Sequence, residues 1–571
     1  MATLLQRLGM TAHRRWPVFV AAWLLVIVGV GAFGGAFGKP MSDSFSIPGI
    51  PSERAADLQE ELFGSGADAL DSPDVSVVLA APEGSTLADQ QPAVDEVVAG
   101  LTALPQMPDG VQLAGPVQAA QELTQQIPDP ADAAALSPLS ADGRVGTVEF
   151  TFDADSAADV EPATLDALDD VLAQAEDAGL TAEVRGNGTA GEMHLGGTSE
   201  LIGIGVAILV LLLTFGSIVA AGLPVVTALI GVGIGVLGIT AATFFTEIGS
   251  TTPVLATMIG LAVGIDYCLF ILARYRNELH HTSDRRQAVG VAVGTAGSAV
   301  VFAGLTVLIA LSALTVVGIP FLTSMGIAAA ATVLVSVLVA ITLLPAVLGM
   351  LGSKAFGAQV RRYSPRRDSD GLQLNNGVRF AGLIGRRPLA VIALVVVALG
   401  ALAIPLKDLH LAFPTDSTAA SDTTQRQAAD LITESFGPGR LGPLLVVVDA
   451  SDVAQEQRET VFGDVVTWAA GQDDVAHAQI VATNEAGTGA QVLITPESGP
   501  DDTATEDLLT DLRDGQDRLE ADTGATLGIT GQTAIQADVS ERLAGALPIY
   551  LAVVIGLAFL LLMLVLSLIH I

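Results

Sequence analysis

The sequence predicts a polytopic α-helical membrane protein with two extracytoplasmic α+β domains and an internal repeat. Three observations lead to this fold class. The 571 residues are 51% hydrophobic, and the mean hydropathy of +0.57 is too high for an ordinary soluble protein. Long apolar runs alternate with acidic segments, while most basic residues gather in short connectors. A unit of one helix, one acidic domain and further helices begins twice.

Membrane-spanning helices account for the apolar runs, because about 20 mostly apolar residues are needed to cross a bilayer. The first run is too long for a cleaved signal peptide and has an internal counterpart, so we expect it to remain as a helix. The sixth run is longer than a single span. The eight predicted spans cover residues 17–37, 200–215, 223–244, 253–273, 298–318, 321–351, 388–406 and 546–566.

The connectors between these spans predict the orientation of the chain. Basic residues cluster before the first span, after the fourth and between the sixth and seventh, and by the positive-inside rule all three clusters lie in the cytoplasm. The N-terminus is then cytoplasmic, and the protein is multi-pass. With only three lysines in an Ala-, Arg- and Asp-rich chain, we expect the plasma membrane of a GC-rich bacterium.

The predicted spans and their orientation divide the chain into seven parts. The predicted order is the N-terminus and first span (1–37), a first outside domain (38–198), spans two to six (199–351), a basic cytoplasmic loop (352–387), the seventh span (388–406), a second outside domain (407–544), and the eighth span with the chain end (545–571).

Both outside domains show alternating strand and helix patterns, which indicate small α/β or α+β units. Strand-like runs lie at 74–80, 145–152, 444–449 and 490–495. Helical patterns lie at 52–63, 164–178, 424–436 and 506–522.

An internal repeat relates the two halves. AADLQEELFG at 55–64 matches AADLITESFG at 428–437 at seven of ten positions. The turns GNGTAGEMH at 186–194 and GQTAIQADVS at 531–540 each precede the next span. Five spans follow the first domain, but one follows the second, and the chain closes on LSLIHI. We therefore expect a C-terminally incomplete product in which LSLIHI is not native sequence.

Composition excludes several classes of function. A net charge of −35 makes nucleic acid an improbable partner, because phosphate binding requires a basic face. The single cysteine, Cys268, allows no intrachain disulfide framework or Cys-rich metal site, and His280 and His281 alone are too few ligands for a metal. Without a phosphate-binding loop motif, ATP is not implied. We expect no cofactor, no metal and no enzymatic activity.

The stretch GLAVGIDYCLFILARYRNE at 260–278 contains the residues most indicative of function. Asp266 lies inside an apolar span, where insertion costs about 2.5–3.5 kcal/mol, and such residues usually face a bundle interior and mark a proton or ion path. The neighbouring Tyr267 shares a helix face with Gly260 and Gly264, a spacing that favours close helix packing. Thr306 of the fifth span is a candidate partner, although its hydroxyl more commonly bonds its own helix. The alternative is a carboxylate satisfied by neighbouring hydroxyls without any change of protonation.

This stretch resembles the fourth-helix signature of the mycobacterial membrane protein large (MMPL) family, in the resistance-nodulation-division (RND) transporter superfamily. The repeat resembles that family over essentially the whole chain. The resemblance implies 11–12 spans, of which about eight are present, ferredoxin-like βαβ porter-like outside domains, and a sterol-sensing-like second to sixth span. It also implies a proton relay at Asp266 and Tyr267. The family's second Asp–Tyr pair, in the tenth span, is absent from this sequence, so the chain as written should be inactive alone.

The function implied is proton-driven export of lipids or other hydrophobic compounds. The expected partners are membrane lipids, a lipid or hydrophobic small-molecule cargo, and protons. The oligomeric state is not indicated. Two alternatives stay open: a multidrug or solute efflux pump using the same machinery, and a non-transporting lipid sensor or assembly protein that uses the sterol-sensing-like helices.

Overall fold

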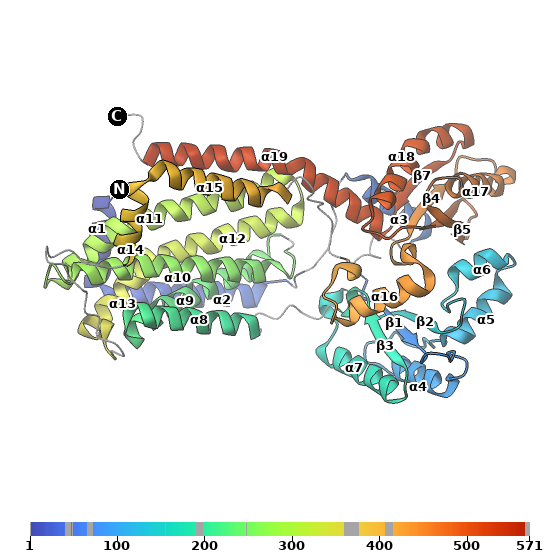
Figure 1. Ribbon diagram of the computed structural model, residues 1–571, viewed down its shortest axis with the longest axis horizontal. Helices are drawn as coiled ribbons and strands as arrows, with labels where there is room; N and C mark the ends of the chain where they lie inside the picture. The colour runs from blue at the N-terminus through green and yellow to red at the C-terminus, as the bar shows by residue number, and fades with distance from the viewer. Residues whose placement is uncertain are drawn as a thin grey trace.

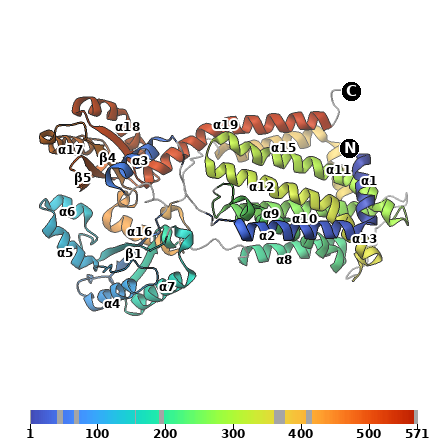
Figure 2. The same cartoon turned by 180° about the vertical axis from the view of Figure 1, so that it is seen from behind.

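The protein has two parts, a long helical bundle and a pair of α/β domains at one end of it (Figures 1 and 2). The computed structural model describes residues 2–39, 41, 47, 49–64, 72–154, 156–189, 198–246, 248–358, 376–405 and 415–565. The closing LSLIHI, residues 359–375 of the basic loop at 352–387 and part of the GNGTAGEMH turn lie outside the described residues.

Apolar helices build the bundle. Six helical segments among the described residues are long and apolar enough to cross a membrane, and α8 contributes a shorter apolar helix, Leu201–Phe215. The predicted span at 388–406 becomes α15, which meets α14 at a bend of 100°. The helices of the bundle are α2 (Trp16–Phe37), α8 (Thr198–Phe215), α9 (Ile218–Ala242), α10 (Thr252–Glu278), α11 (Arg285–Ser312), α12 (Pro320–Leu338), α13 (Leu344–Leu351), α14 (Asn376–Arg386), α15 (Pro388–Ala403) and α19 (Gln532–Val565).

Two features of the bundle differ from the sequence prediction. The amphipathic helix α1 (Ala2–Arg14) precedes the first span and packs on α11, where the Cβ that Gly9 lacks would lie 2.8 Å from Val293 Cβ. The long sixth run holds its extra residues in a π-helical segment (Val339–Leu343) between α12 and α13. Such segments add a residue to a helix without ending it.

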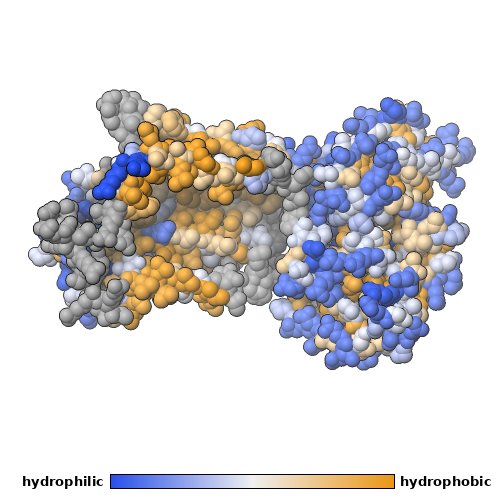
Figure 3. Space-filling view, viewed as in Figure 1, coloured by the Kyte–Doolittle hydropathy of each residue, from blue (hydrophilic) through white to orange (hydrophobic). Residues whose placement is uncertain are grey.

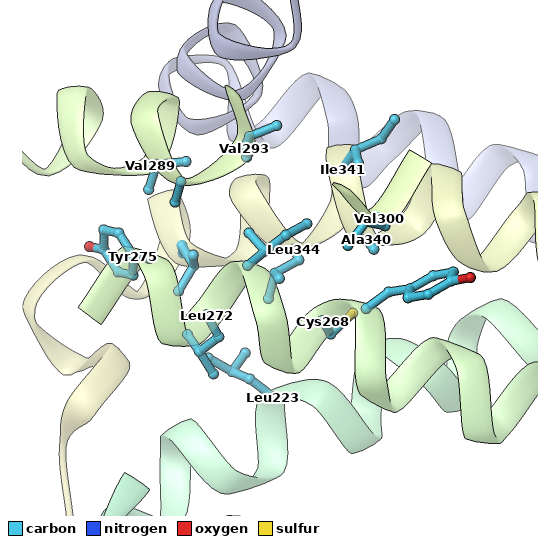
Figure 4. Packing of buried hydrophobic residues seen from close by; sticks show 14 of the residues in the cluster. Leu223, Cys268, Leu272, Tyr275, Val289, Val293, Val300, Ala340, Ile341 and Leu344 are labelled. Carbon is cyan, nitrogen blue, oxygen red and sulfur yellow. The ribbon is translucent and has the colours of Figure 1, made fainter. Parts of the chain in front are cut away.

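The bundle core lies where α9, α10, α11 and α12–α13 meet (Figure 4). Leu272, Tyr275 and Leu344 are fully buried there. Cys268 is buried beside the Thr227 hydroxyl, with 3.2 Å between Sγ and Oγ1, and behaves as a small core residue.

The first α/β domain contains an antiparallel sheet in the order β2–β1–β3. Its helices α4 and α7 cover the face formed by Val75, Val77 and Leu79. The elements are β1 (Asp74–Ala80), α4 (Gln91–Thr102), α5 (Pro116–Gln126), α6 (Pro130–Leu136), β2 (Val145–Thr151), α7 (Pro162–Asp177) and β3 (Thr181–Arg185).

The second α/β domain has a four-stranded antiparallel sheet in the order β5–β6–β4–β7. With two helices on one face, this is the strand order of a ferredoxin-like β-α-β-β-α-β unit. The first domain follows the same order without the strand that corresponds to β5, and a single bridge from Leu139 to Gly146 occupies that edge. The elements are β4 (Leu444–Asp449), α17 (Gln455–Ala470), β5 (Val475–Thr483), β6 (Gly489–Pro496), α18 (Thr503–Thr523) and β7 (Thr526–Thr530).

The two repeated helices, α3 (Pro51–Phe63) and α16 (Thr424–Phe436), are exchanged between the domains. Ala428 and Ile432 of α16 pack on the second face of the first sheet, and the Val184 N–H of β3 donates to Thr424 Oγ1 at 2.8 Å. In return α3 packs on the second sheet, where the Cβ that Gly528 lacks would lie 2.7 Å from Ala55 Cβ. Each sheet is therefore covered on its second face by the other half of the chain.

Candidate functional site

Asp266 lies near the middle of α10. It is 14 residues after Thr252 and 12 before Glu278, so about 18–21 Å of helix extends on either side. Helices α9, α11 and α12 pack around α10. The ridge Met258–Ala262–Asp266–Phe270, with a spacing of four residues, is left exposed.

This exposed ridge is not covered by α9, α11 or α12. Figure 3 shows the apolar part of the molecule hollowed between a band formed by α15 and α19 and a band formed by α8, and in the same view α10 runs between the two. Met258 and Phe270 are 58% and 60% exposed, so both apolar neighbours of Asp266 on the ridge are as uncovered as the carboxylate.

Among the described residues Asp266 lies on the exposed side of α10, and the expectation that it faces a bundle interior and finds a partner stays a prediction. Asp266 makes no hydrogen bond or ion pair with any residue that the structure describes. The physical reason is geometric, because the opposite face of α10 is filled by its contacts with three helices. The proposed hydroxyl partner does not reach the carboxylate either, since Thr306 Oγ1 donates to Phe302 O of its own helix at 3.0 Å.

Tyr267 leaves α10 about 100° round the helix from Asp266. Its side chain is only 6% exposed, and Tyr267 Cε2 would lie 3.6 Å from a Cβ at Gly304 of α11. No hydrogen bond joins Tyr267 to Asp266 in the described structure. The two residues are adjacent in sequence but face different surroundings, one in the core and one on the hollow.

Gly260 and Gly264 lie where α10 approaches its neighbours most closely. A Cβ at Gly260 would be 2.6 Å from Thr332 Cγ2 of α12, and a Cβ at Gly264 would be 3.0 Å from Ala228 Cβ of α9. Ser336 Oγ of α12 donates to Gly260 O at 3.4 Å. Side chains larger than hydrogen would push these helices apart, so the glycines fix the position of the helix that carries Asp266.

Sequence reasoning missed Thr332 and Ser336, which form the α12 side of this contact. Thr332 also fills the space beside Gly235 of α9, where a Cβ would lie 2.6 Å from its Cγ2. The available signal was a pair of hydroxyl residues four positions apart in an apolar run, a spacing that places both on one helix face.

An apolar bundle that carries an intramembrane carboxylate and holds two α/β domains at one end defines a polytopic membrane protein with a paired extramembrane unit. Within that class, the chain belongs to the MMPL family, whose sequence profile matches residues 44–391 and 417–569. This finding confirms the resemblance drawn from the residues at 260–278.

Similar proteins agree with the family. The chain is 34% identical to the membrane protein YdfJ of Bacillus subtilis over 99% of its own length and 73% of YdfJ. It is 29% identical to the mycolic acid-containing lipids exporter MmpL11 of Mycolicibacterium smegmatis, over 63% of this chain and 38% of that protein. The heme uptake protein MmpL11 of Mycobacterium tuberculosis is 28% identical over 63% of this chain and 37% of its own.

One solved structure supports the fold. The hedgehog release protein Disp from the water bear Hypsibius dujardini superposes with a TM-score of 0.53, covering 98% of this chain and 83% of that chain. At 14% sequence identity, this likeness concerns the arrangement of the chain in space and not the chemistry of any residue.

Proposed function

We propose that this protein is a proton-driven exporter of lipids or other hydrophobic compounds, and that Asp266 carries the proton. The observation that supports this proposal is the placement of Asp266, an exposed carboxylate in the middle of an apolar helix. A carboxylate without a counter-charge costs about 2.5–3.5 kcal/mol at the centre of a membrane helix. No contact with a described residue offsets this cost, so a change of charge at this position explains the presence of Asp266 better than packing does.

The proposed coupling runs through rigid contacts. Protonation of Asp266 neutralises the face of α10 that borders the hollow, while loss of the proton restores a charge that favours a wetter surrounding. Gly260 and Gly264 hold α10 tightly to α9 and α12, so α10 moves together with them. The helix α19 is continuous from the second α/β domain into the bundle and offers a direct mechanical link between the two parts. Tyr267 is proposed to complete the relay after a rearrangement that brings its phenol to the carboxylate.

The cargo class comes from chemistry shared by the relatives. One relative is named for exporting mycolic acid-containing lipids and another for heme uptake, and both cargoes carry large apolar surfaces. Between the α/β domains, beside Arg185 and Asp416, a cavity measures about 80 Å³, far below the volume of a lipid. Handling cargo there requires the two domains to separate, which would break the hydrogen bond that Ser417 Oγ, in the segment before α16, donates to Asp501 Oδ2 of the second domain at 2.8 Å.

The orientation proposed is the one given by the basic clusters. Arg274, Arg276, Arg285 and Arg286 lie at the end of the bundle that carries α1, away from the α/β domains. With that end in the cytoplasm of a bacterial cell, the α/β domains lie outside the plasma membrane.

The test is Asp266→Asn, which keeps the size of the side chain and removes its titration. Because the chain as written is expected to be inactive alone, the substitution is made in a complete version that carries the second Asp–Tyr pair. That version is reconstituted in liposomes with an imposed pH gradient, and both fluorescent-lipid export and proton flux are measured. We expect Asp266→Asn to abolish both and Asp266→Glu to retain part of each. Asp422→Asn, a change to an exposed acid of the second domain, is the matched control.

Proton binding is read separately from transport. Infrared difference spectra between acid and neutral pH contain contributions from many carboxyls, so the wild-type spectrum is compared with that of Asp266→Asn, which should lack one protonated-carboxyl component. Export by Asp266→Asn at the wild-type rate under the same gradient would refute the proposal and favour a sensor or assembly protein, which has no use for this titration. Inward movement of cargo would refute the direction alone.

A further inference from the structure

A second feature of the bundle lies away from Asp266. A cavity of about 1270 Å³ opens between α2, α9 and α12 at the end of the bundle nearest the α/β domains. It is lined by Phe321 and Val335 of α12, which are about 21 Å apart along the helix. Neither Asp266 nor Tyr267 lines it. The cavity is larger than the roughly 300–1,000 Å³ of most small-molecule pockets, and it is deeper than the ~15 Å of one leaflet of a ~30 Å hydrocarbon core.

The lining of this cavity is amphipathic. The deep end is apolar, with Val26 of α2 and Ile234 of α9. The end near the α/β domains is rich in hydroxyls, which come from the ends of three elements: Thr243, Thr246, Thr251, Thr252, Thr323 and Ser324. A ligand that fits both ends has an apolar tail and a polar head.

One of these hydroxyls is buried without a partner. Thr252 is fully buried, and its Oγ1 makes no hydrogen bond in the described structure. A buried hydroxyl left unpaired costs on the order of 1–3 kcal/mol, and this one has too little exposed area to meet a ligand in the cavity without a local shift of α10.

A single charge completes the polar end. Lys39 is the one charged side chain among the described residues that line the cavity, and it makes no ion pair with any of them. The backbone N–H of Lys39 donates to Thr243 Oγ1 at 2.8 Å, which holds the backbone of Lys39 at the cavity rim. Lys39 and three arginines of the first domain are the only Lys or Arg residues between Arg15 and Arg274. In an acidic protein, an isolated lysine at a membrane surface is suited to an anion.

We propose that this cavity binds one anionic phospholipid from the leaflet adjoining the α/β domains. The phosphate lies against Lys39 and the hydroxyls, and an acyl chain extends between α2, α9 and α12. Thr332 lines this cavity and also belongs to the contact that positions α10, but neither Asp266 nor Tyr267 lines the cavity, and lipid binding there requires no gradient.

The structure offers a variant that fills the cavity without disturbing the fold. A Cβ at Gly238, which lines the cavity, would meet no atom within 4 Å, so Gly238→Leu places a side chain in the lipid's space. Gly233→Leu is the matched control, because Gly233 lies on the same helix, also meets no atom within 4 Å, and does not line the cavity. Lys39→Gln removes the charge, and Lys39→Arg keeps it.

The experiment is native mass spectrometry of the full chain, released from nanodiscs that contain equal phosphatidylglycerol and phosphatidylcholine. We expect one retained lipid, mostly phosphatidylglycerol, in the wild type, Gly233→Leu and Lys39→Arg. Gly238→Leu should lose it, and Lys39→Gln should reduce the preference for phosphatidylglycerol about fivefold, the effect of one lysine at an anionic surface.

Two results would overturn the proposal: equal lipid retention by Gly238→Leu and Gly233→Leu, or no preference for phosphatidylglycerol in the wild type. Asp266→Asn should retain the lipid normally, so failure of the relay and failure of this site give different results.

Discussion

Replacing Gly260 by alanine tests whether the contact between α10 and α12 fixes the helix that carries Asp266. The new Cβ would lie 2.6 Å from Thr332 Cγ2 and 3.1 Å from Val232 Cγ2. Carbon atoms in contact prefer about 3.5–4.0 Å, so the helices have to separate by roughly 1 Å. Overpacking of this kind costs about 1–3 kcal/mol, from which a helix propensity gain of up to about 1 kcal/mol is subtracted.

The net destabilisation expected is therefore about 1.5 kcal/mol, the middle of a range of roughly 0–3 kcal/mol, or about a tenfold change in the folding equilibrium. The assay is the melting temperature of the purified chain in one detergent, followed by intrinsic fluorescence. Gly233→Ala is the control, because its Cβ meets no atom within 4 Å. We expect Gly260→Ala to melt several degrees below the wild type and Gly233→Ala to melt at or above it.

A second substitution identifies the atom responsible. Thr332→Ser removes Cγ2, after which the closest atom of residue 332 to a Cβ at Gly260 is Thr332 Cβ at 3.9 Å. Thr332→Ser should therefore rescue most, but not all, of the stability lost in Gly260→Ala, because the contact with Val232 Cγ2 at 3.1 Å remains. It should not rescue Gly235→Ala, whose Cβ would still lie 2.7 Å from the retained Oγ1. Equal rescue of both variants, or no loss of stability in Gly260→Ala, would refute the packing argument.

Two further predictions concern the α/β domains. Asp538 is 2% exposed and receives Arg513 Nη1 and Nη2 at 2.6 and 2.9 Å and the Ser52 N–H at 2.9 Å. Asp538→Ala leaves the Arg513 guanidinium without its counter-charge and should lower the free energy of unfolding by about 3–5 kcal/mol, measured with denaturant. Asp514→Ala, at an exposed position of α18, is the control and should lower it by less than about 0.5 kcal/mol. Similar losses in the two variants would contradict this reasoning. Burial raises the pKa of Glu183 on β3 above its unfolded value near 4.5, against a hydrogen bond from Thr424 that lowers it. The folded protein then holds the proton more tightly, so stability is greatest below pH 4.5 and falls as the pH rises through the folded pKa. Melting curves from pH 4 to 8 should be flatter for Glu183→Gln than for the wild type, and an unchanged profile would exclude this contribution.

Local patterns were sufficient to predict many elements of the fold. The run at 74–80 forms β1, and the helical pattern at 424–436 forms α16 with the same ends. Hydrophobic periodicity and apolar length act within a few residues of each position, so they report local conformation well. The helix α1 was missed because thirteen residues of mixed polarity resemble a solvated terminus until a partner covers them.

Tertiary placement could not be read in the same way. Nothing in the sequence of α16 specifies that it covers the first sheet rather than its own, because its apolar stripe fits either. The direction of Asp266 could not be predicted from the sequence for a related reason. Its neighbours along α10 are apolar whether they face a core or a hollow, and only the positions of α9, α11 and α12 decide between these. Thr332 and Ser336 were missed because the partner of a glycine contact lies far away in sequence.

The exchange of α3 and α16 also means that the first sheet is covered only late in synthesis of the chain. The first sheet is complete once β3 has left the ribosome, yet Val78, Ala80 and Val145 remain uncovered until α16 has been made. About 250 residues separate β3 from the end of α16, so at 5–20 residues per second the delay is roughly 10–50 s. During that interval a finished but half-covered sheet is exposed to every other nascent chain, and a holding chaperone on that side of the membrane would have a defined apolar face to protect.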